Sequence, residues 1–195
     1  MNPGLADTVR ARFPQHAIGA HHYRGQETVV LKRDGLLDVA RFLRDDPAMR
    51  FDFLMDLSAV DYLKFGTSLS SAPALATPSP LPYSMTPKPD AEPWERLVSN
   101  NEFRFEVVYH FYSSVHHHRL RVKVPVPVSD AAVASLTGLW ASANWYEREA
   151  WDMFGIRFTG HPDLRRLLMY EAFQGHPLRK DYPATKRQPL IGPLN

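Results

Sequence analysis

The sequence predicts an α+β fold, in which a two-layer αββαβββ domain with a mixed sheet precedes a helical segment and an extended C-terminal tail. Three observations predict this fold. Helix-like and strand-like periodicities alternate over residues 1–128. The chain of 195 residues is 44% apolar, which suffices to bury one core. Over residues 156–195 the periodicity is lost apart from one apolar run at 167–170, so we expect no second core.

The first elements form an αββ unit. In residues 4–13 apolar side chains recur at every fourth position, which predicts an amphipathic helix that Pro14 ends. Residues 16–23 and 27–33 are rich in strand formers and are separated by a short turn that contains Gly25. They therefore predict a β-hairpin.

A second helix and a third strand follow the hairpin. Asp34-Gly35 interrupts the strand pattern, and the apolar residues that follow predict a helix that stops near Asp46-Pro47. In residues 51–60 alternate positions are apolar, which predicts a strand with one buried face. The residues expected on that face are Phe51, Phe53, Met55, Leu57 and Ala59.

The last part of the domain contains a proline-rich insertion and two strands. Residues 66–93 hold seven prolines among Ser, Thr and Ala, which predicts an extended or disordered loop or a strap on a partner. Residues 103–113 and 118–126 predict two strands with a turn between them. The three cations of the second strand alternate with aliphatic residues, so we expect them on a solvent-exposed face; they are Arg119, Arg121 and Lys123.

The helical segment spans residues 129–155. Ser129-Asp130 predicts the start of one helix, which we expect to run through Leu139. Asn144 is a favourable N-cap for a second helix, which Gly155 should end. On this helix Arg148 and Asp152 are four residues apart, which predicts an ion pair between them.

The tail, residues 156–195, carries a short repeat. Gly-His-Pro occurs at 160–162 and again at 175–177, and a pair of cations follows each copy. Glycine permits a positive φ, and proline forces the residue before it into an extended conformation, so each copy predicts a turn. From residue 157 onward there are seven Lys or Arg and three Asp or Glu. We expect such a basic tail to become ordered by docking onto an acidic or concave partner.

Composition excludes several classes of function. The absence of cysteine excludes disulfides, cysteine-bound zinc or iron–sulfur clusters, and a thiol nucleophile. A net charge of +2 and the lack of a recognised motif give no indication of nucleic-acid binding. The longest uncharged stretch, 65–87, holds five prolines, and the charged N-terminus does not match a signal peptide. We expect a soluble, intracellular chain that reaches a membrane only through a partner.

No catalytic constellation is visible. The sequence contains no glycine-rich phosphate loop, no GxSxG and no HExxH. His161 and His176 each sit in a turn without a dense set of further ligands, so a metal-dependent hydrolase that uses both is a weak alternative. The three consecutive histidines at 116–118 lie at a predicted turn and suggest at most adventitious metal binding.

The end of the chain resembles the signature of the 30-kDa-type hydrophilic subunit of respiratory complex I, the NADH:quinone oxidoreductase. The resemblance rests on three segments: EREAWDMFGI at 147–156, GHPDLRR at 160–166 and GHPLRKDYP at 175–183. It extends upstream to Asp61-Tyr62, FEVVYH at 105–110, RLRVKV at 119–124, Leu139-Trp140 and Ala143-Asn144-Trp145. The family usually has a shorter, more polar segment where 66–93 stands here.

The resemblance implies a non-catalytic structural subunit of the peripheral arm of a proton-translocating enzyme, on the cytoplasmic side of the cell inner membrane. It implies no cofactor in this chain, because FMN and the iron–sulfur clusters belong to partner subunits. The expected partners are chiefly the large quinone-site subunit and the neighbouring cluster-bearing subunits, with no nucleic acid. The residues expected at the partner interface are Glu147, Arg148, Glu149, Trp151, Asp152, His161, Asp163, Arg165, Arg166, His176, Arg179, Lys180, Asp181 and Tyr182.

Two other interpretations stay open at this point. One is the equivalent subunit of a related membrane-bound hydrogenase-type complex, because such relatives share parts of the motif. The other is a stand-alone module that binds an anionic ligand through the basic tail. A free species near 22 kDa in native extracts would favour that module.

Overall fold

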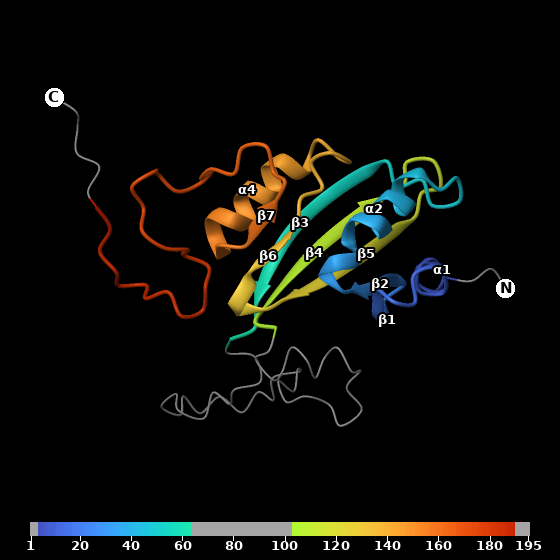
Figure 1. The fold of residues 1–195 in the computed structure, drawn as a ribbon, viewed down its shortest axis with the longest axis horizontal. Coiled ribbons are helices and arrows are strands. Elements are labelled where there is room, and N and C mark those ends of the chain that lie inside the picture. Colours follow the sequence, from blue (N-terminus) through green and yellow to red (C-terminus); the bar gives the residue numbers. More distant parts are fainter. Residues whose placement is uncertain (1–3, 64–102, 190–195) are drawn as a thin grey trace, which may run out of the picture.

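The computed structural model describes residues 4–63 and 103–189, and within them a five-stranded sheet carries helices on one face (Figure 1). The proline-rich stretch 66–93 lies outside the described residues. The first elements are α1 (Leu5–Arg12), β1 (Ala17–Tyr23), β2 (Gln26–Leu31), the short 3-10 helix η1 (Arg33–Gly35) and α2 (Leu36–Asp45). They confirm the predicted αββα order, with β1 and β2 paired antiparallel.

The central strands are β3 (Phe53–Asp61), β4 (Phe105–Tyr112) and β5 (Arg119–Val126). The strand order is β1-β2-β5-β4-β3, in which β2 and β5 run parallel and all other neighbours run antiparallel. The sheet is therefore mixed, as the sequence predicts. One apolar cluster fills the space between the sheet and the helices, and Tyr109 and Phe111 are among its largest fully buried side chains.

The alternation predicted for β3 holds only in part. The pairing of β3 with β4 shifts register between Leu54 and Asp56, which marks a β-bulge. As a result Leu54 is fully buried, while Phe53 is 51% exposed and Met55 is only partly buried. The prediction of Phe53 on the core face is wrong because a bulge changes which residues point inward, and the apolar pattern alone does not reveal it.

The cations of β5 lie opposite the aliphatic residues, as predicted, but two of them are not free in solvent. Lys123 is largely buried, and its Nζ lies 2.7 Å from Glu106 Oε1. Arg121 donates from Nε to Thr28 Oγ1 at 2.9 Å. Of the three, only Arg119 is exposed. This face of the sheet therefore holds buried polar pairs, which is costly unless each group finds a partner.

Residues 129–139 do not form the predicted helix. The chain instead makes a 3-10 turn, η2 (Val128–Asp130), and a short strand, β6 (Ala132–Ala134), which pairs in parallel with β7 (Arg157–Thr159). Val133 and Phe158 at the centre of this pair are buried. Burial against a distant segment outweighs the local helix signal here, because helix propensity is a weak preference that tertiary contacts override.

Helix α4 (Ala143–Phe154) begins one residue before Asn144, so Asn144 lies in its first turn and is not the N-cap. Gly155 ends the helix with a φ of +74°, as predicted. Three hydrogen bonds attach α4 and the turn before it to the segment around β3, and one of them runs from Ser142 Oγ to the carbonyl of Leu54 at 3.1 Å. Tyr146 Oη donates to the carbonyl of Met55 at 2.8 Å, and Trp140 Nε1 donates to the carbonyl of Phe51 at 3.1 Å.

Candidate functional site

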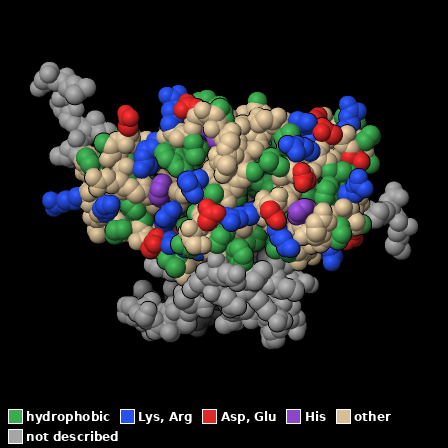
Figure 2. Space-filling model, viewed as in Figure 1, with side chains coloured by type: hydrophobic (Ala, Val, Ile, Leu, Met, Phe, Trp, Pro, Cys, Tyr) green, Lys and Arg blue, Asp and Glu red, His purple; other side chains and the backbone are tan. Residues whose placement is uncertain are grey.

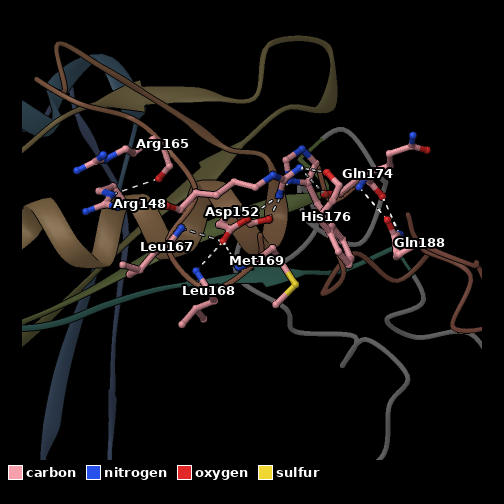
Figure 3. Close-up of polar contacts among 12 residues, drawn as sticks. Arg148, Asp152, Arg165, Leu167, Leu168, Met169, Gln174, His176 and Gln188 are labelled. Atoms are coloured by element: carbon pink, nitrogen blue, oxygen red, sulfur yellow. Dashed lines mark hydrogen bonds and ion pairs between the residues drawn. The ribbon is translucent and has the colours of Figure 1, made fainter. Parts of the chain in front are cut away.

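The residues of the predicted signature meet at α4, where the tail folds back over the helix (Figures 1 and 3). Asp152, on the inner face of α4, is fully buried. Its Oδ1 lies 2.6 Å from Arg166 Nη1. Its Oδ2 accepts the backbone N–H groups of residues 167, 168 and 169 at 3.1, 2.9 and 2.8 Å. One carboxylate therefore fixes the position of three consecutive residues of the tail.

The pKa of Asp152 reflects how strongly neighbouring groups of the chain stabilise its negative charge. Burial by itself raises the pKa of this carboxyl group, because a low-dielectric environment disfavours the charge. The N–H groups of Leu167, Leu168 and Met169 and the guanidinium of Arg166 more than offset that effect and hold the pKa below its usual range. Asp152 is therefore ionised at neutral pH although no part of it reaches solvent.

Arg148 does not pair with Asp152, so that prediction is wrong. It donates from Nε to the carbonyl of Arg165 at 3.2 Å and from Nη2 to the carbonyl of Arg166 at 3.1 Å. Its guanidinium also lies 5.2 Å from the ring centroid of Trp145. The four-residue spacing permits an ion pair between Arg148 and Asp152, but Arg166 in the tail binds the Asp152 carboxylate instead.

The second copy of the repeat caps the C-terminal end of α4. The last four carbonyls of a helix have no partner within the helix. The Trp151 carbonyl accepts from Gly155 N at 2.8 Å, and the Asp152 carbonyl accepts from His176 Nδ1 at 3.0 Å. The Met153 carbonyl accepts from the backbone N–H of residue 178 at 3.1 Å, and the Phe154 carbonyl from Nε of residue 179 at 2.5 Å. All four carbonyls are thus satisfied, three of them by the tail.

A second buried charge links the tail to the sheet. Arg104, just before β4, donates to both oxygens of Asp61 at 2.9 and 2.7 Å and to both oxygens of Asp181 at 2.9 and 2.6 Å. Asp61 Oδ2 also accepts the backbone N–H of Lys180 at 2.8 Å. Burial raises the pKa of Asp61, and the bonds from Arg104, Lys180 and Leu63 lower it further than burial raises it.

Glu147 is also buried, and it has a different environment from Asp152 and Asp61. Its Oε1 accepts the backbone N–H of Leu136 at 2.6 Å, and its Oε2 accepts from Ser135 Oγ at 2.6 Å. Within residues 4–63 and 103–189 no ion pair neutralises it. Burial therefore raises the pKa of Glu147 to about 7, against a partial lowering by Ser135 and Leu136.

The predicted interface residues divide by exposure. Three are buried inside the chain: Glu147, Arg148 and Asp152. Six are partly buried: Trp151, His161, Arg166, His176, Arg179 and Tyr182. Five are exposed: Glu149, Asp163, Arg165, Lys180 and Asp181. The sequence predicts a tail without a place on the body of the chain, and the contacts above correct this for residues up to 189. Docking of the tail on a partner stays a prediction.

The two histidines do not form a metal site together. His161 Nε2 contacts the carbonyl of Asn144 at the start of α4, whereas His176 contacts the carbonyl of Asp152 near its end. These two carbonyls are about 12 Å apart along a helix that rises about 1.5 Å per residue. Over the described part of the chain no three His, Cys, Asp or Glu residues are grouped as metal ligands would be. The hydrolase alternative, which needs both histidines at one metal, is therefore wrong.

Sequence reasoning missed Asp61 and Arg104 as members of this site. The resemblance places Asp61 in a matching segment but gives no role for it. Arg104 lies 77 residues before Asp181 in the chain, and no local pattern predicts that they meet. The usable signal is a single Asp at the end of an apolar strand, which must find a partner if it is buried.

Gly155 and Gly160 offer a matched test of how closely the tail packs. Both have a positive φ, +74° and +85°. A Cβ at Gly160 would meet nothing within 4 Å, whereas one at Gly155 would overlap Arg179 Nη2 and lie 2.6 Å from the ring of His176. We expect Gly160→Ala to cost about 1 kcal/mol of unfolding free energy from backbone strain alone, and Gly155→Ala about 2 kcal/mol or more because the tail must also move. Equal losses in urea titrations would contradict close packing at Gly155.

Comparison with known proteins identifies a family with a similar sequence. The sequence profile of the family described as "Respiratory-chain NADH dehydrogenase, 30 Kd subunit" matches residues 29–188. The chain is 41% identical over 182 residues to the subunit of this type in the NADH-quinone oxidoreductase of Roseiflexus sp. (strain RS-1), covering 93% of this chain and 84% of that protein. It is 38% identical over 189 residues to the same subunit from Citrifermentans bemidjiense, covering 96% and 94%.

Solved structures show the same fold. The structure titled "Nqo5 of the trypsin-resistant fragment (1-134) in P63 form" is similar at a TM-score of 0.52 and 31% identity, covering 81% of this chain and 95% of that one. The membrane-bound sulfane sulfur reductase, an archaeal respiratory membrane complex, contains a chain with a TM-score of 0.59 and 18% identity, which shows the fold alone. No helix among the described residues is long and apolar enough to cross a bilayer. The chain therefore belongs to the family of 30-kDa subunits of the respiratory-chain NADH dehydrogenase.

Proposed function

We propose that this chain serves as the non-catalytic, 30-kDa-type structural subunit in the peripheral arm of an NADH–quinone oxidoreductase. In that role it supports electron transfer from NADH to quinone and carries no cofactor of its own. The arm would lie on the cytoplasmic side of the inner membrane, and the chain would reach the membrane only through the complex. The relatives that are about 40% identical bear the name of this subunit, which supports the proposal.

The observation that carries the proposal is that the buried charged side chains of the signature bind groups of the same chain. Asp152, Arg166 and Arg148 are all bonded to the chain's own groups, and together they fix the path of the tail. A catalytic acid or base must instead face the reacting group of a substrate. Charges that are saturated inside the chain support a role in holding a shape.

The partner surface would consist of what this network leaves exposed. Trp145 on α4 is 60% exposed, and Leu168 and Leu178 in the tail are 56% and 50% exposed. Aromatic residues and arginine are enriched in protein interfaces, and Arg165 lies in the same segment as Leu168. We propose that the large quinone-site subunit and the cluster-bearing subunits cover this surface. Of the predicted interface residues, Glu149, Asp163, Arg165, Lys180 and Asp181 are accessible for such contacts.

An equivalent role in a hydrogenase-type complex has weaker support. The archaeal membrane complex that shares the fold is only 18% identical to this chain, whereas the match to "Nqo5" is 31% identical. A stand-alone anion-binding module is not favoured either, because family members of similar length are named as subunits of a larger enzyme.

Affinity purification tests the proposal. A tagged copy should be expressed in cells that lack the untagged gene, and membranes should be solubilised in mild detergent. We expect a large complex with NADH–quinone reductase activity to co-purify with the chain, and that activity to be absent from membranes of the deletion strain. The isolated chain should show no flavin absorbance, no bound iron and no NADH oxidation. A free monomer as the main species in native extracts, or a stoichiometric cofactor in the isolated chain, would contradict the proposal.

A further inference from the structure

We propose that the end of the tail forms a rigid cationic ledge, made of Arg179, Lys180, Lys186 and Arg187, that docks onto an acidic segment of a neighbouring subunit. The inference rests on the proposed function and adds to it the chemistry of one partner surface. It also assigns different roles to the cations of the two copies of the repeat: those of the first copy pair with acids of the chain, whereas those of the second make no ion pair with the described residues.

The distribution of ion pairs along the tail separates the two copies. Every cation in the first part has an acid close by: Arg157 pairs with Asp130 at 3.2 Å, Arg165 with Asp163 at 2.9 Å and Arg166 with Asp152 at 2.6 Å. The four ledge cations make no ion pair with any residue that the structure describes. Asp181, the only acid between them, is held by Arg104. The excess of positive charge is therefore concentrated between residues 179 and 187.

The backbone beneath the ledge is fixed before any partner arrives. The N–H of Leu178 donates to the carbonyl of Met153, and the N–H of Lys180 donates to the buried Asp61. The N–H of Tyr182 donates to the carbonyl of Arg179 at 3.0 Å. At the far end Tyr170 Oη donates to the carbonyl of Pro189 at 2.7 Å. A surface that is held in this way loses little conformational entropy on binding, so its contacts contribute more fully to affinity.

Arg179 is the partly buried member of the ledge, so its charge is the one that burial penalises. It is half-buried, its Nε bonds only to the carbonyl of Phe154, and its guanidinium lies 5.2 Å from the ring centroid of Phe105. Burial and the nearby charge of Arg104 lower its pKa. A partner carboxylate that bonds the remaining N–H groups of the planar fork would relieve this cost, and Arg suits such bidentate contacts better than Lys.

The surroundings favour a protein partner over nucleic acid. Binding of single strands uses aromatic rings whose faces are open for base stacking. Here the rings pack on one another: Tyr170 lies 5.6 Å from Phe173, and Phe173 lies 6.1 Å from Tyr182, as centroid distances. Leu178, beside Arg179, is 50% exposed and offers an apolar contact of the kind found in protein interfaces. Figure 2 shows blue cationic side chains at the end of the molecule where Figure 1 draws the C-terminal segment.

The ledge can be tested by reversing the charge of ledge side chains that make none of the hydrogen bonds holding the tail. The side chains of Lys180 and Arg187 are exposed, and neither carries one of the bonds that anchor the tail. The double variant Lys180→Glu/Arg187→Glu should therefore keep the thermal unfolding midpoint of the full chain while reducing the co-purified NADH–quinone oxidoreductase by about tenfold or more. Arg12→Glu on α1, at the other end of the molecule, is the control with the same kind of charge change, and it should leave recovery unchanged.

The outcomes are distinct. Undiminished recovery of the complex with the double variant, an equal loss with Arg12→Glu, or unfolding of the double variant would each overturn the ledge. Failure of the wild-type chain to co-purify with the enzyme would refute the proposed function instead. A photo-crosslinker at position 178 should give a product whose partner peptide is rich in Asp or Glu, and a basic partner peptide would contradict the inference. If wild-type chain binds phosphatidylglycerol vesicles and the variant does not, while recovery is unaffected, the ledge is a membrane contact and the inference is wrong.

Discussion

Asp152→Asn is expected to lower the unfolding free energy by about 3–5 kcal/mol, the usual cost of removing one partner from a buried ion pair. The carboxylate accepts three backbone N–H groups on one oxygen and Arg166 on the other. An amide has one acceptor oxygen, so its NH₂ group would face either Arg166 or the N–H groups of the tail. Either arrangement leaves donors opposed to donors in a site with no access to solvent.

Asp163→Asn is the matched control, because Asp163 also pairs with an arginine but is 57% exposed. An exposed pair contributes about 0–1 kcal/mol, so this variant should unfold almost like the wild type. Urea titration measures the free energies, and limited proteolysis should show faster cleavage near residues 166–169 only in Asp152→Asn. Similar stabilities for the two variants would mean that Asp152 does not anchor the tail.

Glu147→Gln is expected to remove most of the loss of unfolding free energy that the wild type shows as the pH rises from about 4.5 to 7. Burial raises the folded-state pKa of Glu147 to about 7, above the ordinary value of 4.5, so the folded state holds this proton more tightly than the unfolded state. The stability that this group contributes is therefore fully present below about pH 4.5. It is lost as the pH rises toward 7, and the gap between the two values corresponds to about 3 kcal/mol.

The glutamine variant should be more stable than the wild type at pH 8 and similar to it at pH 4.5. Its carbonyl can accept from the Leu136 N–H, and its amide can donate to Ser135 Oγ, which then donates to Thr137 Oγ1 at 2.8 Å. Glu149→Gln on the exposed face of α4 is the control and should leave the pH profile unchanged. The measurement is unfolding free energy against pH for the three proteins. Parallel wild-type and Glu147→Gln profiles would show that folding does not raise the pKa of Glu147.

Most of the sheet domain could be predicted because its signals are local. The spacing of apolar residues in α1 and α2 and the turn at Gly25 each depend on a short run of neighbouring residues, and all three are confirmed. The parts that could not be predicted depend on distant partners. β6 is a strand only because β7 lies beside it, and the bulge in β3 is set by its pairing with β4. No pattern within either segment contains that information.

The part of the site that lies in the signature was predictable as a set of residues but not as an arrangement, whereas Asp61 and Arg104 were not predicted as members. The signature contains Asp152, Arg148 and Arg166, and helical spacing suggests the pair Arg148–Asp152. The actual pair is Arg166–Asp152, because the tail reverses direction over α4 and brings Arg166 to the carboxylate. The burial of Glu147 could not be inferred either, since glutamate in a helix usually faces solvent, and only the packed structure shows that it does not.

The bond from Lys180 to Asp61 has a consequence for the order of events during synthesis. These residues are 119 positions apart, and the neighbouring contact between Asp181 and Arg104 spans 77. Contacts of such long range form late, and here they need residues that are synthesised 77 and 119 positions after their partners. Until then Arg104 can engage Asp61 alone and the end of α4 lacks its cap. Because the cationic ledge becomes fixed in the same step, a chain that lacks residues 176–181 would lose both the cap of α4 and the support of the ledge.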